Sequence, residues 1–242
     1  MKFKIFKNQN IIYGVTDSSL GSINPFANFD SEKRLVQFIN NKKITEKNLV
    51  FADQVHKDGV HICSKEDSGS IRLGIDALVT NHKNQILVIK TADCVPILLF
   101  DPVKKIVAVI HGGRKSVTAK IISKTIKKMQ KSFGILPKNV LTGIGPHIRI
   151  ESYYLKPKSI SQLKNTFWKK YFINKKDRIF FDLTQAILDE LTNSSVLKNN
   201  IEDCQIDTYK EYKKFFSARR KDENSAIYQQ KLPCFASFIG LK

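Results

Sequence analysis

The chain has 242 residues, of which 42% are hydrophobic and 10% aromatic, so it can build a substantial core and is too apolar for a disordered protein. Charged side chains interrupt its most apolar stretch, residues 86–110, and no unbroken apolar run follows the basic N-terminus. The pattern therefore predicts neither a membrane span nor a secretory signal. The four cysteines have no short paired spacing, which favours thiols over disulfides, and we expect a cytoplasmic protein.

The net charge of +19 could indicate a nucleic-acid partner. However, only seven of the 41 basic residues are arginine, the residue that most often contacts bases and phosphates, and the lysines are spread along the whole chain. We therefore expect that nucleic acid is not a primary partner. Attraction for small anionic substrates remains a reasonable consequence of the charge.

The first half of the chain predicts one helix and then a series of strands. A helix is expected over Ser31–Asn40, and a strand over Asn48–Val55 leads directly into His56. A central block rich in Ile, Val and Leu then predicts four buried strands. These strands are Ala77–Thr80, Ile86–Thr91, Pro96–Phe100 and Ile106–Ile110.

The second half mixes helices and strands. The apolar spacing becomes helical between Val117 and Phe133, where lysines occupy the opposite face and Gly134 is placed to end the helix. The pattern predicts one α/β (α+β) domain over residues 1–242, with a mixed central sheet and flanking helices, but it does not fix the strand order. The remaining expected elements are strands at Val140–Ile144, Glu202–Ile206 and Cys234–Ile239, and helices near Lys158–Tyr171 and Asp182–Leu191, with Asp182 as N-cap.

Three short segments, each next to a predicted strand, carry residues suited to a metal: Gln54–His56, Thr91–Pro96 and His111–Gly113. Imidazole nitrogen and thiolate sulfur suit zinc, and two histidines with one cysteine leave a fourth tetrahedral position open, as in catalytic sites. The spacing is not that of a zinc finger, because 37 residues separate the first histidine from the cysteine and 16 separate the cysteine from the second histidine. Spacing alone leaves open that these are structural residues.

A family resemblance adds to this pattern. From about Phe51 onward the chain resembles the bacterial family long named multicopper polyphenol oxidases or laccase-like proteins, now regarded as zinc-dependent purine nucleoside phosphorylases with adenosine deaminase side activity and sometimes named peptidoglycan editing factor. The segments that carry the resemblance, in order, are Q-V-H at Gln54–His56, D-A-L-V-T at Asp76–Thr80, K-T-A-D-C-V-P at Lys90–Pro96, L-L-F-D-P at Leu98–Pro102, V-A-V-I-H-G-G at Val107–Gly113, I-G-P at Ile144–Pro146 and F-F-S-A-R-R at Phe215–Arg220.

The resemblance implies that His56, Cys94 and His111 bind one Zn²⁺. It also implies phosphorolysis of adenosine or inosine to a free base and ribose 1-phosphate, in which zinc would act as a Lewis acid or activate water for deamination. The small-molecule partners would be purine nucleosides and phosphate, and the protein would be a monomer or homodimer. A copper cluster is not expected, since the chain has no His-x-His pair.

Other residues near these motifs are candidates with structural alternatives. Asp93 could be a general acid or base, or could orient a neighbour, and it could equally cap nearby backbone. Arg219 and Arg220 could clamp a phosphate or form surface salt bridges. Lys90 and His147 could contact substrate, although a strand-end lysine is usually solvated. Gly112-Gly113 could bring backbone N–H groups to an anion or only permit the turn.

Three segments depart from the family pattern, at residues 13–18, 114–116 and 153–154. Where the family usually has H-A-G-W-R-G, this chain has His111-Gly112-Gly113-Arg114-Lys115-Ser116. Two other functions therefore remain open beside the phosphorylase: a hydrolase that edits peptidoglycan precursors, and a degenerate zinc-binding protein without turnover.

Overall fold

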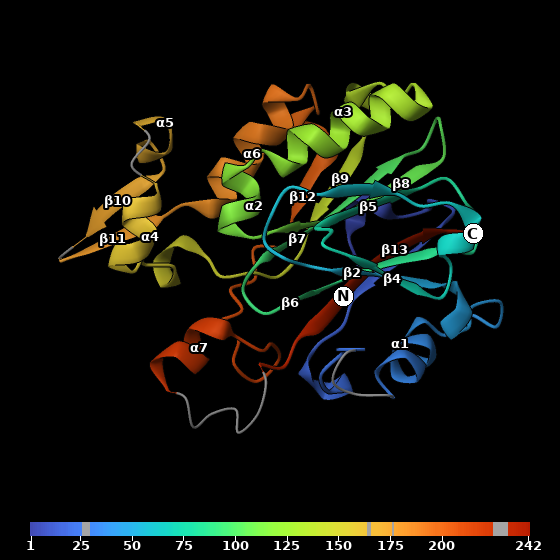
Figure 1. The fold of residues 1–242 in the computed structure, drawn as a ribbon, viewed down its shortest axis with the longest axis horizontal. Coiled ribbons are helices and arrows are strands. Elements are labelled where there is room, and N and C mark those ends of the chain that lie inside the picture. Colours follow the sequence, from blue (N-terminus) through green and yellow to red (C-terminus); the bar gives the residue numbers. More distant parts are fainter. Residues whose placement is uncertain (26–29, 164–165, 176, 225–231) are drawn as a thin grey trace.

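Two mixed β-sheets pack face to face, and helices cover the outer face of each sheet (Figure 1). This is the arrangement in a computed structural model that describes residues 1–25, 30–163, 166–175, 177–224 and 232–242. The layers form one α+β domain, which confirms the predicted fold class. The strands divide between two large sheets, whereas the sequence pattern indicated one central sheet.

The first sheet has five strands in the order β1-β13-β6-β2-β4. Its antiparallel half joins β1 to β13 and β13 to β6, and its parallel half joins β6 to β2 and β2 to β4. The strands are β1 Ile11–Val15, β13 Phe235–Leu241, β6 Ile86–Thr91, β2 Leu49–Asp53 and β4 Ser70–Leu73.

The second sheet has six strands in the order β12-β9-β7-β8-β5-β3. Its central strands β9, β7, β8 and β5 are antiparallel, and the edge strands β12 and β3 pair parallel to their neighbours. The strands are β12 Ile201–Asp203, β9 Leu141–Ile144, β7 Val95–Asp101, β8 Ile106–Gly112, β5 Ala77–Thr80 and β3 Val60–Ile62.

Successive side chains of β7 point to opposite faces of its sheet, and both faces pack against apolar side chains. Leu98 and Phe100 point into the core between the two sheets, whereas Ile97 and Leu99 point into the core beneath the helices. Because successive strand residues face opposite sides, an uninterrupted apolar strand must be buried on both faces. Each such buried side chain contributes roughly 1.5–3 kcal/mol.

The longer helices lie where apolar periodicity predicts them. α3 and α6 cover the six-stranded sheet, and α1 covers the five-stranded sheet (Figure 1). The α-helices are α1 Ser31–Ile39, α2 Arg114–Thr118, α3 Ile121–Phe133, α4 Pro157–Gln162, α5 Thr166–Lys169, α6 Leu183–Asn193 and α7 Ala218–Glu223. Short 3₁₀ helices lie at Lys4–Phe6, Ser18–Leu20, Glu46–Asn48, Lys65–Asp67, Pro137–Asn139, Ile150–Ser152 and Lys198–Asn200.

The predicted helix before Gly134 is two helices, because Lys120 adopts a left-handed backbone with φ of 66° between α2 and α3. The Lys120 ammonium lies 4.3 Å and 4.4 Å from the ring centroids of Phe167 and Trp168, a tertiary contact that local spacing could not reveal. The helix predicted over Lys158–Tyr171 is likewise two elements, α4 and α5, and residues 164–165 between them lie outside the described part of the chain.

The other expected elements are confirmed to within a few residues, including Asp182, which caps α6 by accepting a hydrogen bond from Gln185 N at 2.8 Å. The sequence pattern did not predict β1, β3, β4, α7 or the hairpin of β10 Phe172–Lys175 with β11 Arg178–Phe181. In the part of the chain that the structure describes, no helix combines the length and apolarity that crossing a membrane requires.

Candidate metal centre

The side chains of His56, Cys94 and His111 converge where the chain passes from one sheet to the other. His56 follows β2, Cys94 lies in the connection from β6 to β7, and His111 lies within β8, opposite Pro96 of β7. Their candidate ligand atoms all lie within 4.8 Å of one another. Residues separated by up to 55 positions therefore form one group with donors that could hold a metal ion.

The geometry of this group fits a tetrahedral ion. Cys94 Sγ lies 3.7 Å from His56 Nε2. Zinc–sulfur and zinc–nitrogen bonds at a tetrahedral angle would place such atoms about 3.6 Å apart. Gly113 leaves the space that these side chains need: a Cβ there would lie 3.0 Å from His56 Cδ2, 3.3 Å from Cys94 Sγ and 3.4 Å from His111 Cε1. The residues present therefore fit a metal, and a side chain at residue 113 would crowd all three of them.

Asp76 organises two of the three candidate ligands, although it was not among the predicted site residues. Its fully buried carboxylate accepts hydrogen bonds from His111 Nδ1 at 2.7 Å and from His56 N at 3.0 Å, as well as from Val55 N and Lys57 N. The bond at Nδ1 leaves His111 Nε2 to face the metal group. The bonds to residues 55–57 fix the backbone of His56, whose φ of 57° is unusual for a residue with a side chain. Two sequence signals could have found Asp76: it is the first residue of the D-A-L-V-T segment of the family resemblance, and it is a carboxylate placed directly before the apolar strand β5.

Electrostatics favour the ligand form of the cysteine. Burial opposes ionisation of the Cys94 thiol, but the imidazoles of His111 and His56 outweigh burial and lower its pKa to about 6. Burial likewise opposes protonation of His111, while the Cys94 sulfur and the Asp76 carboxylate raise its pKa to about 9. Negative charge on sulfur beside two imidazoles is the arrangement that a divalent cation stabilises.

A cleft of about 390 Å³ opens beside the group. His56 and Cys94 line it, together with Asp93 and Arg219, so the structure brings these four predicted residues to one place. The volume falls within the range of small-molecule sites. The other lining residues are Val55, Ala92, Arg114, Lys115, Ile148, Tyr153, Ala218 and Asp222.

Asp93 lines the cleft, but its carboxylate oxygens are engaged by other parts of the chain. They accept hydrogen bonds from Thr208 Oγ1 at 2.7 Å, Ser217 Oγ at 2.9 Å and Arg219 N at 2.7 Å. Burial raises the pKa of the Asp93 carboxyl, and these three donors partly offset the rise. The contacts tie the Cys94 loop to the start of α7, while the role of Asp93 in a reaction stays a prediction.

The two arginines of the predicted clamp are used differently. Arg220 donates to three backbone carbonyl oxygens, those of Thr208, Tyr209 and Phe215, and is not among the residues that line the cleft. Arg219 is only 7% exposed, lines the cleft and donates from Nη2 to Tyr154 O at 2.7 Å. The structure therefore brings one arginine of the pair, rather than both, to the candidate site.

Lys90 and His147 are not among the described residues that line this cleft. Lys90 lies in β6, where its backbone pairs with the Gln54 side chain, and burial lowers the pKa of its amine. His147 is buried: Nδ1 donates to Gly145 O at 2.7 Å, and Nε2 accepts from Thr184 Oγ1 at 2.8 Å. Their predicted contacts with substrate stay predictions.

Two of the three segments that depart from the family pattern line the cleft. Arg114 and Lys115 come from residues 114–116, and Tyr153 comes from residues 153–154. Residues 13–18 are not among the lining residues, and Tyr13 instead belongs to the core between the sheets. In the sequence, Arg114 and Tyr153 stand out only as departures from the family pattern, and they were not predicted as candidate site residues.

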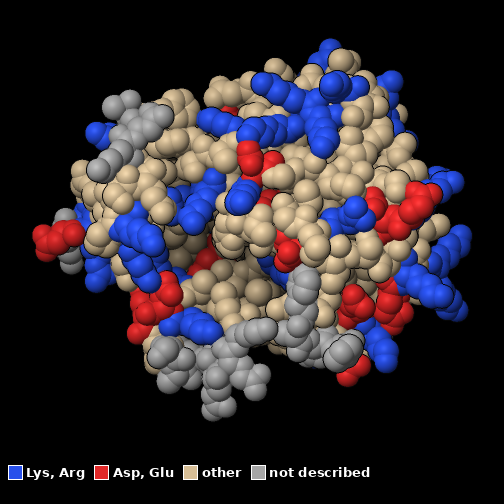
Figure 2. All heavy atoms as spheres, viewed as in Figure 1, with Lys and Arg blue, Asp and Glu red and all other residues tan. Residues whose placement is uncertain are grey.

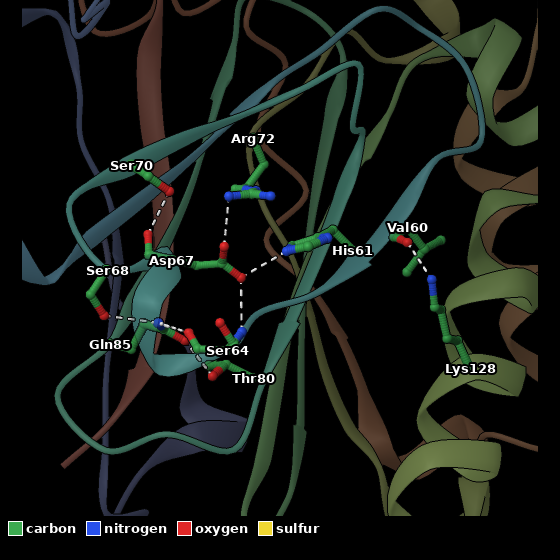
Figure 3. A network of polar contacts seen from close by, with 10 residues as sticks. All are labelled: Val60, His61, Ser64, Asp67, Ser68, Ser70, Arg72, Thr80, Gln85 and Lys128. Carbon is green, nitrogen blue, oxygen red and sulfur yellow. Dashed lines mark hydrogen bonds and ion pairs between the residues drawn. The ribbon is translucent and has the colours of Figure 1, made fainter.

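A second group of potential ligands, His61, Cys63 and Asp67, lies apart from this cleft. Figure 3 shows its carboxylate inside a closed polar network: Asp67 accepts from His61 Nε2 at 2.7 Å, Arg72 Nη1 at 2.7 Å and Ser64 N at 2.8 Å. Burial raises the pKa of the Cys63 thiol to about 12. A carboxylate already neutralised by arginine, beside a protonated thiol, suits a structural network better than a metal site.

Fold and site together define a single-domain α+β protein that has a mononuclear candidate metal centre at the side of a small-molecule cleft. The sequence model of the family described as multi-copper polyphenol oxidoreductase laccase matches residues 16–228. The chain therefore belongs to this family, which confirms the predicted resemblance.

Several relatives carry the name purine nucleoside phosphorylase. The chain is 33% identical over 183 residues to one from Clostridium acetobutylicum, covering 74% of each chain, and 29% identical over 233 residues to one from Rickettsia prowazekii, covering 95% of this chain and 91% of that protein. It is 34% identical to one from Bacteroides thetaiotaomicron, over 61% of this chain but only 56% of that protein's length. A relative from an unknown prokaryotic organism is named adenosine deaminase, at 30% identity over 63% of this chain and 59% of that protein.

Solved structures share the fold. The hypothetical protein YfiH of Bacillus licheniformis superposes with a TM-score of 0.86 at 23% identity, covering 98% of this chain and 94% of that chain. YlmD of Geobacillus stearothermophilus also superposes with a TM-score of 0.86, at 21% identity over 99% of this chain and 94% of that one. The relatives' names support an enzyme of nucleoside metabolism.

Proposed function

We propose that the protein is a zinc-dependent purine nucleoside phosphorylase that converts adenosine or inosine and phosphate into the free base and ribose 1-phosphate. The observation that supports this most is the convergence of His56, Cys94 and His111 beside a cleft of small-molecule size. The names of the relatives supply the substrate class. In the reaction, a phosphate oxygen bonds to C1′ of the ribose, the bond from C1′ to the purine nitrogen breaks, and the base leaves with the electron pair and takes up a proton.

His56, Cys94 and His111 would hold the ion, because two nitrogens and one sulfur are the donor set that zinc accepts with a position to spare. Bound zinc would supply Lewis-acid stabilisation of negative charge. Asp76 orients His111 and the His56 backbone, and Asp93 fixes the loop that carries Cys94 against α7. We assign Asp93 a positioning role within this proposal, since three donors already engage its carboxylate.

The test is to load the purified protein with zinc, incubate it with inosine and phosphate, and follow the release of hypoxanthine and ribose 1-phosphate. We expect phosphate-dependent release in the wild type. Cys94→Ala should lose both zinc and activity, because it removes the only sulfur donor of the group. Cys234→Ala is the matched control, since this thiol lies outside the group. No release from any purine nucleoside at full zinc occupancy would contradict the proposal.

Adenosine deamination is a second candidate activity, favoured by the relative named adenosine deaminase. Formation of inosine from adenosine without phosphate would show it. An amidase acting on peptidoglycan precursors, or zinc binding without turnover, would be indicated if neither purine reaction occurred. All four cysteines are free, which fits the cytoplasm that we propose as the site of action.

A further inference from the structure

The positive and negative side chains that line the cleft beside the candidate metal centre differ in whether they have ion-pair partners. Among the described residues that line it, the carboxylates already have partners: Asp93 accepts from three donors, and Asp222 pairs with Lys156 at 2.8 Å. The lining cations are Arg114, Lys115 and Arg219, and none forms an ion pair with a carboxylate in the described part of the chain. The cleft therefore holds three cations that no carboxylate neutralises in an ion pair, and the Cys94 sulfur, another negative group of the lining, belongs to the candidate metal group.

Both arginines are held in place by neutral groups. Arg114 Nη2 donates to Ser159 Oγ at 3.3 Å and to Gln162 Oε1 at 3.0 Å, both of α4. Arg219 lies with Cζ 4.0 Å from the ring centroid of Tyr154, and its buried Nη1 has no hydrogen-bond partner among the described residues. Guanidinium groups that are oriented but not neutralised are available to a ligand that brings negative charge.

Tyr153 places the two arginines at one site. The Arg114 guanidinium is close enough to act on the charge of the Tyr153 phenol, and Arg219 Cζ lies 5.7 Å from the Tyr153 ring centroid. Burial raises the pKa of the Tyr153 phenol to about 12, with Arg114, Arg219 and Cys94 as its charged neighbours. A phenolic O–H is a hydrogen-bond donor and can donate to an oxyanion. A guanidinium from α2, a phenol and a guanidinium from α7 thus meet beside a metal ligand.

We propose that Arg114, Tyr153 and Arg219 form an oxyanion subsite beside the metal centre and that inorganic phosphate occupies it. The choice of inorganic phosphate as the occupant rests on the proposed phosphorylase reaction. The inference that the subsite prefers an anion rests on the geometry alone. Phosphate matches the site because its oxygens accept several charge-assisted hydrogen bonds at once. A subsite that fixes phosphate at one end of the cleft would orient an oxygen toward a sugar bound beside it.

The test measures binding of inorganic phosphate by titration calorimetry to the zinc-loaded wild type and to Arg114→Gln. Arg114 is only partly buried and its partners are polar, so this variant should fold. We expect its phosphate affinity to fall at least tenfold, while KM for inosine changes less than twofold. Lys127→Gln removes one charge from the exposed face of α3 and should leave phosphate affinity unchanged. Arg219→Lys serves as a second variant. It keeps the positive charge but loses the paired N–H donors of the guanidinium, so it should also weaken phosphate binding.

Adenosine 5′-monophosphate is the second probe, because a phosphate monoester carries the same chemistry as inorganic phosphate. If it binds far more tightly than phosphate and adenosine separately, and depends on Arg114, the anion belongs to a nucleotide and the inorganic-phosphate assignment is wrong. Phosphate affinity within twofold of wild type in both arginine variants also overturns the proposal. Arginine-dependent phosphate binding without nucleoside cleavage would support the subsite and contradict the proposed function, so the two failures are distinguishable.

Discussion

Asp76 Oδ1 accepts a hydrogen bond from His111 Nδ1 at 2.7 Å, and the same oxygen accepts from the backbone N–H of His56 at 3.0 Å. One carboxylate thus fixes the ring of one candidate ligand and the backbone of another. The donors outweigh burial and lower the pKa of the Asp76 carboxyl, which keeps it charged as an acceptor. Metal binding should therefore depend on Asp76 although it is not a ligand.

Asp76→Asn should lower zinc affinity by about 10- to 100-fold, because the amide cannot accept from every donor that the carboxylate serves. It should also reduce the free energy of unfolding by about 2–4 kcal/mol, since an amide N–H₂ would face buried N–H groups. Asp67→Asn is the matched control, as it alters a carboxylate with a histidine partner outside the cleft. Zinc titration with a chelator and urea unfolding measure the two effects. Equal zinc affinity in the Asp76 and Asp67 variants would contradict the role.

Gly113→Ala should weaken metal binding by at least about tenfold without unfolding the protein, since crowded ligands lose their geometry. The backbone of Gly113 has φ of −71°, which alanine adopts, but a Cβ would lie 3.0 Å from the His56 ring. Ser116→Ala in α2 adds no atom near the metal ligands and should retain zinc. Thermal unfolding of the metal-free proteins tests the fold, and metal analysis tests the site. Full zinc occupancy in the glycine variant would show that the ligand set or its spacing is wrong.

Asp93→Asn separates a positioning role from acid–base catalysis. Asparagine can accept from Ser217 Oγ and Arg219 N through its oxygen, while its amide donates to the Thr208 hydroxyl. A positioning residue should therefore tolerate the change, with kcat within about tenfold of wild type, whereas loss of a general acid or base costs roughly 10²- to 10⁴-fold. Steady-state kinetics with inosine decide this, with zinc content as the control for the neighbouring Cys94. A loss of kcat beyond a hundredfold at unchanged zinc content would return Asp93 to a catalytic role.

His147 should make the protein sensitive to mild acid. Burial, together with the nearby Arg149 guanidinium, lowers its pKa to about 4 from an ordinary value of 6.5. Between these values the unfolded chain binds the proton and the folded one does not, so stability is fully present above pH 6.5 and falls as the pH drops toward 4. The loss attributable to this residue is up to about 3 kcal/mol. Urea unfolding of wild type and His147→Gln between pH 7 and pH 4.5 measures it: the variant should be less stable at pH 7 and lose less on acidification. Parallel pH dependence of both proteins would rule out His147 as the source.

The exposed lysines and arginines of the basic surface have little effect on the predicted metal binding, kinetics and stability. On the face shown in Figure 2, lysine and arginine side chains are spread over the surface and acidic side chains lie among them, as the even distribution of lysine along the chain predicted. Exposed charges of this kind are screened by salt and contribute little individually. The few cations that matter for the proposed chemistry are those that line the cleft.

The sequence by itself predicted the apolar strands, because each is long enough and apolar enough to be recognised without its neighbours. The element from Ile86 to Thr91 has the bounds that the pattern indicated, and the Asp182 cap lies where a helix start requires one. It also predicted the residue types of the candidate metal centre, since His56, Cys94 and His111 stand in the segments that carry the family resemblance. That they lie together is a tertiary fact, because nothing local relates positions that have 37 and 16 residues between them along the chain.

Only the tertiary structure decided which neighbours act on these residues. Asp76, Arg114 and Tyr153 were not predicted as site residues, because their importance lies in what approaches them from other strands and helices. Gly113 was noted for its turn or its backbone N–H, whereas the structure shows the space that it leaves beside His56 and Cys94. The adjacent residues Arg219 and Arg220 show the same limit: one faces the cleft and the other is occupied by backbone carbonyls, since successive residues of a helix point in different directions. The sequence determines which chemical group each residue carries. The direction and the partners of that group are determined only when distant segments pack together.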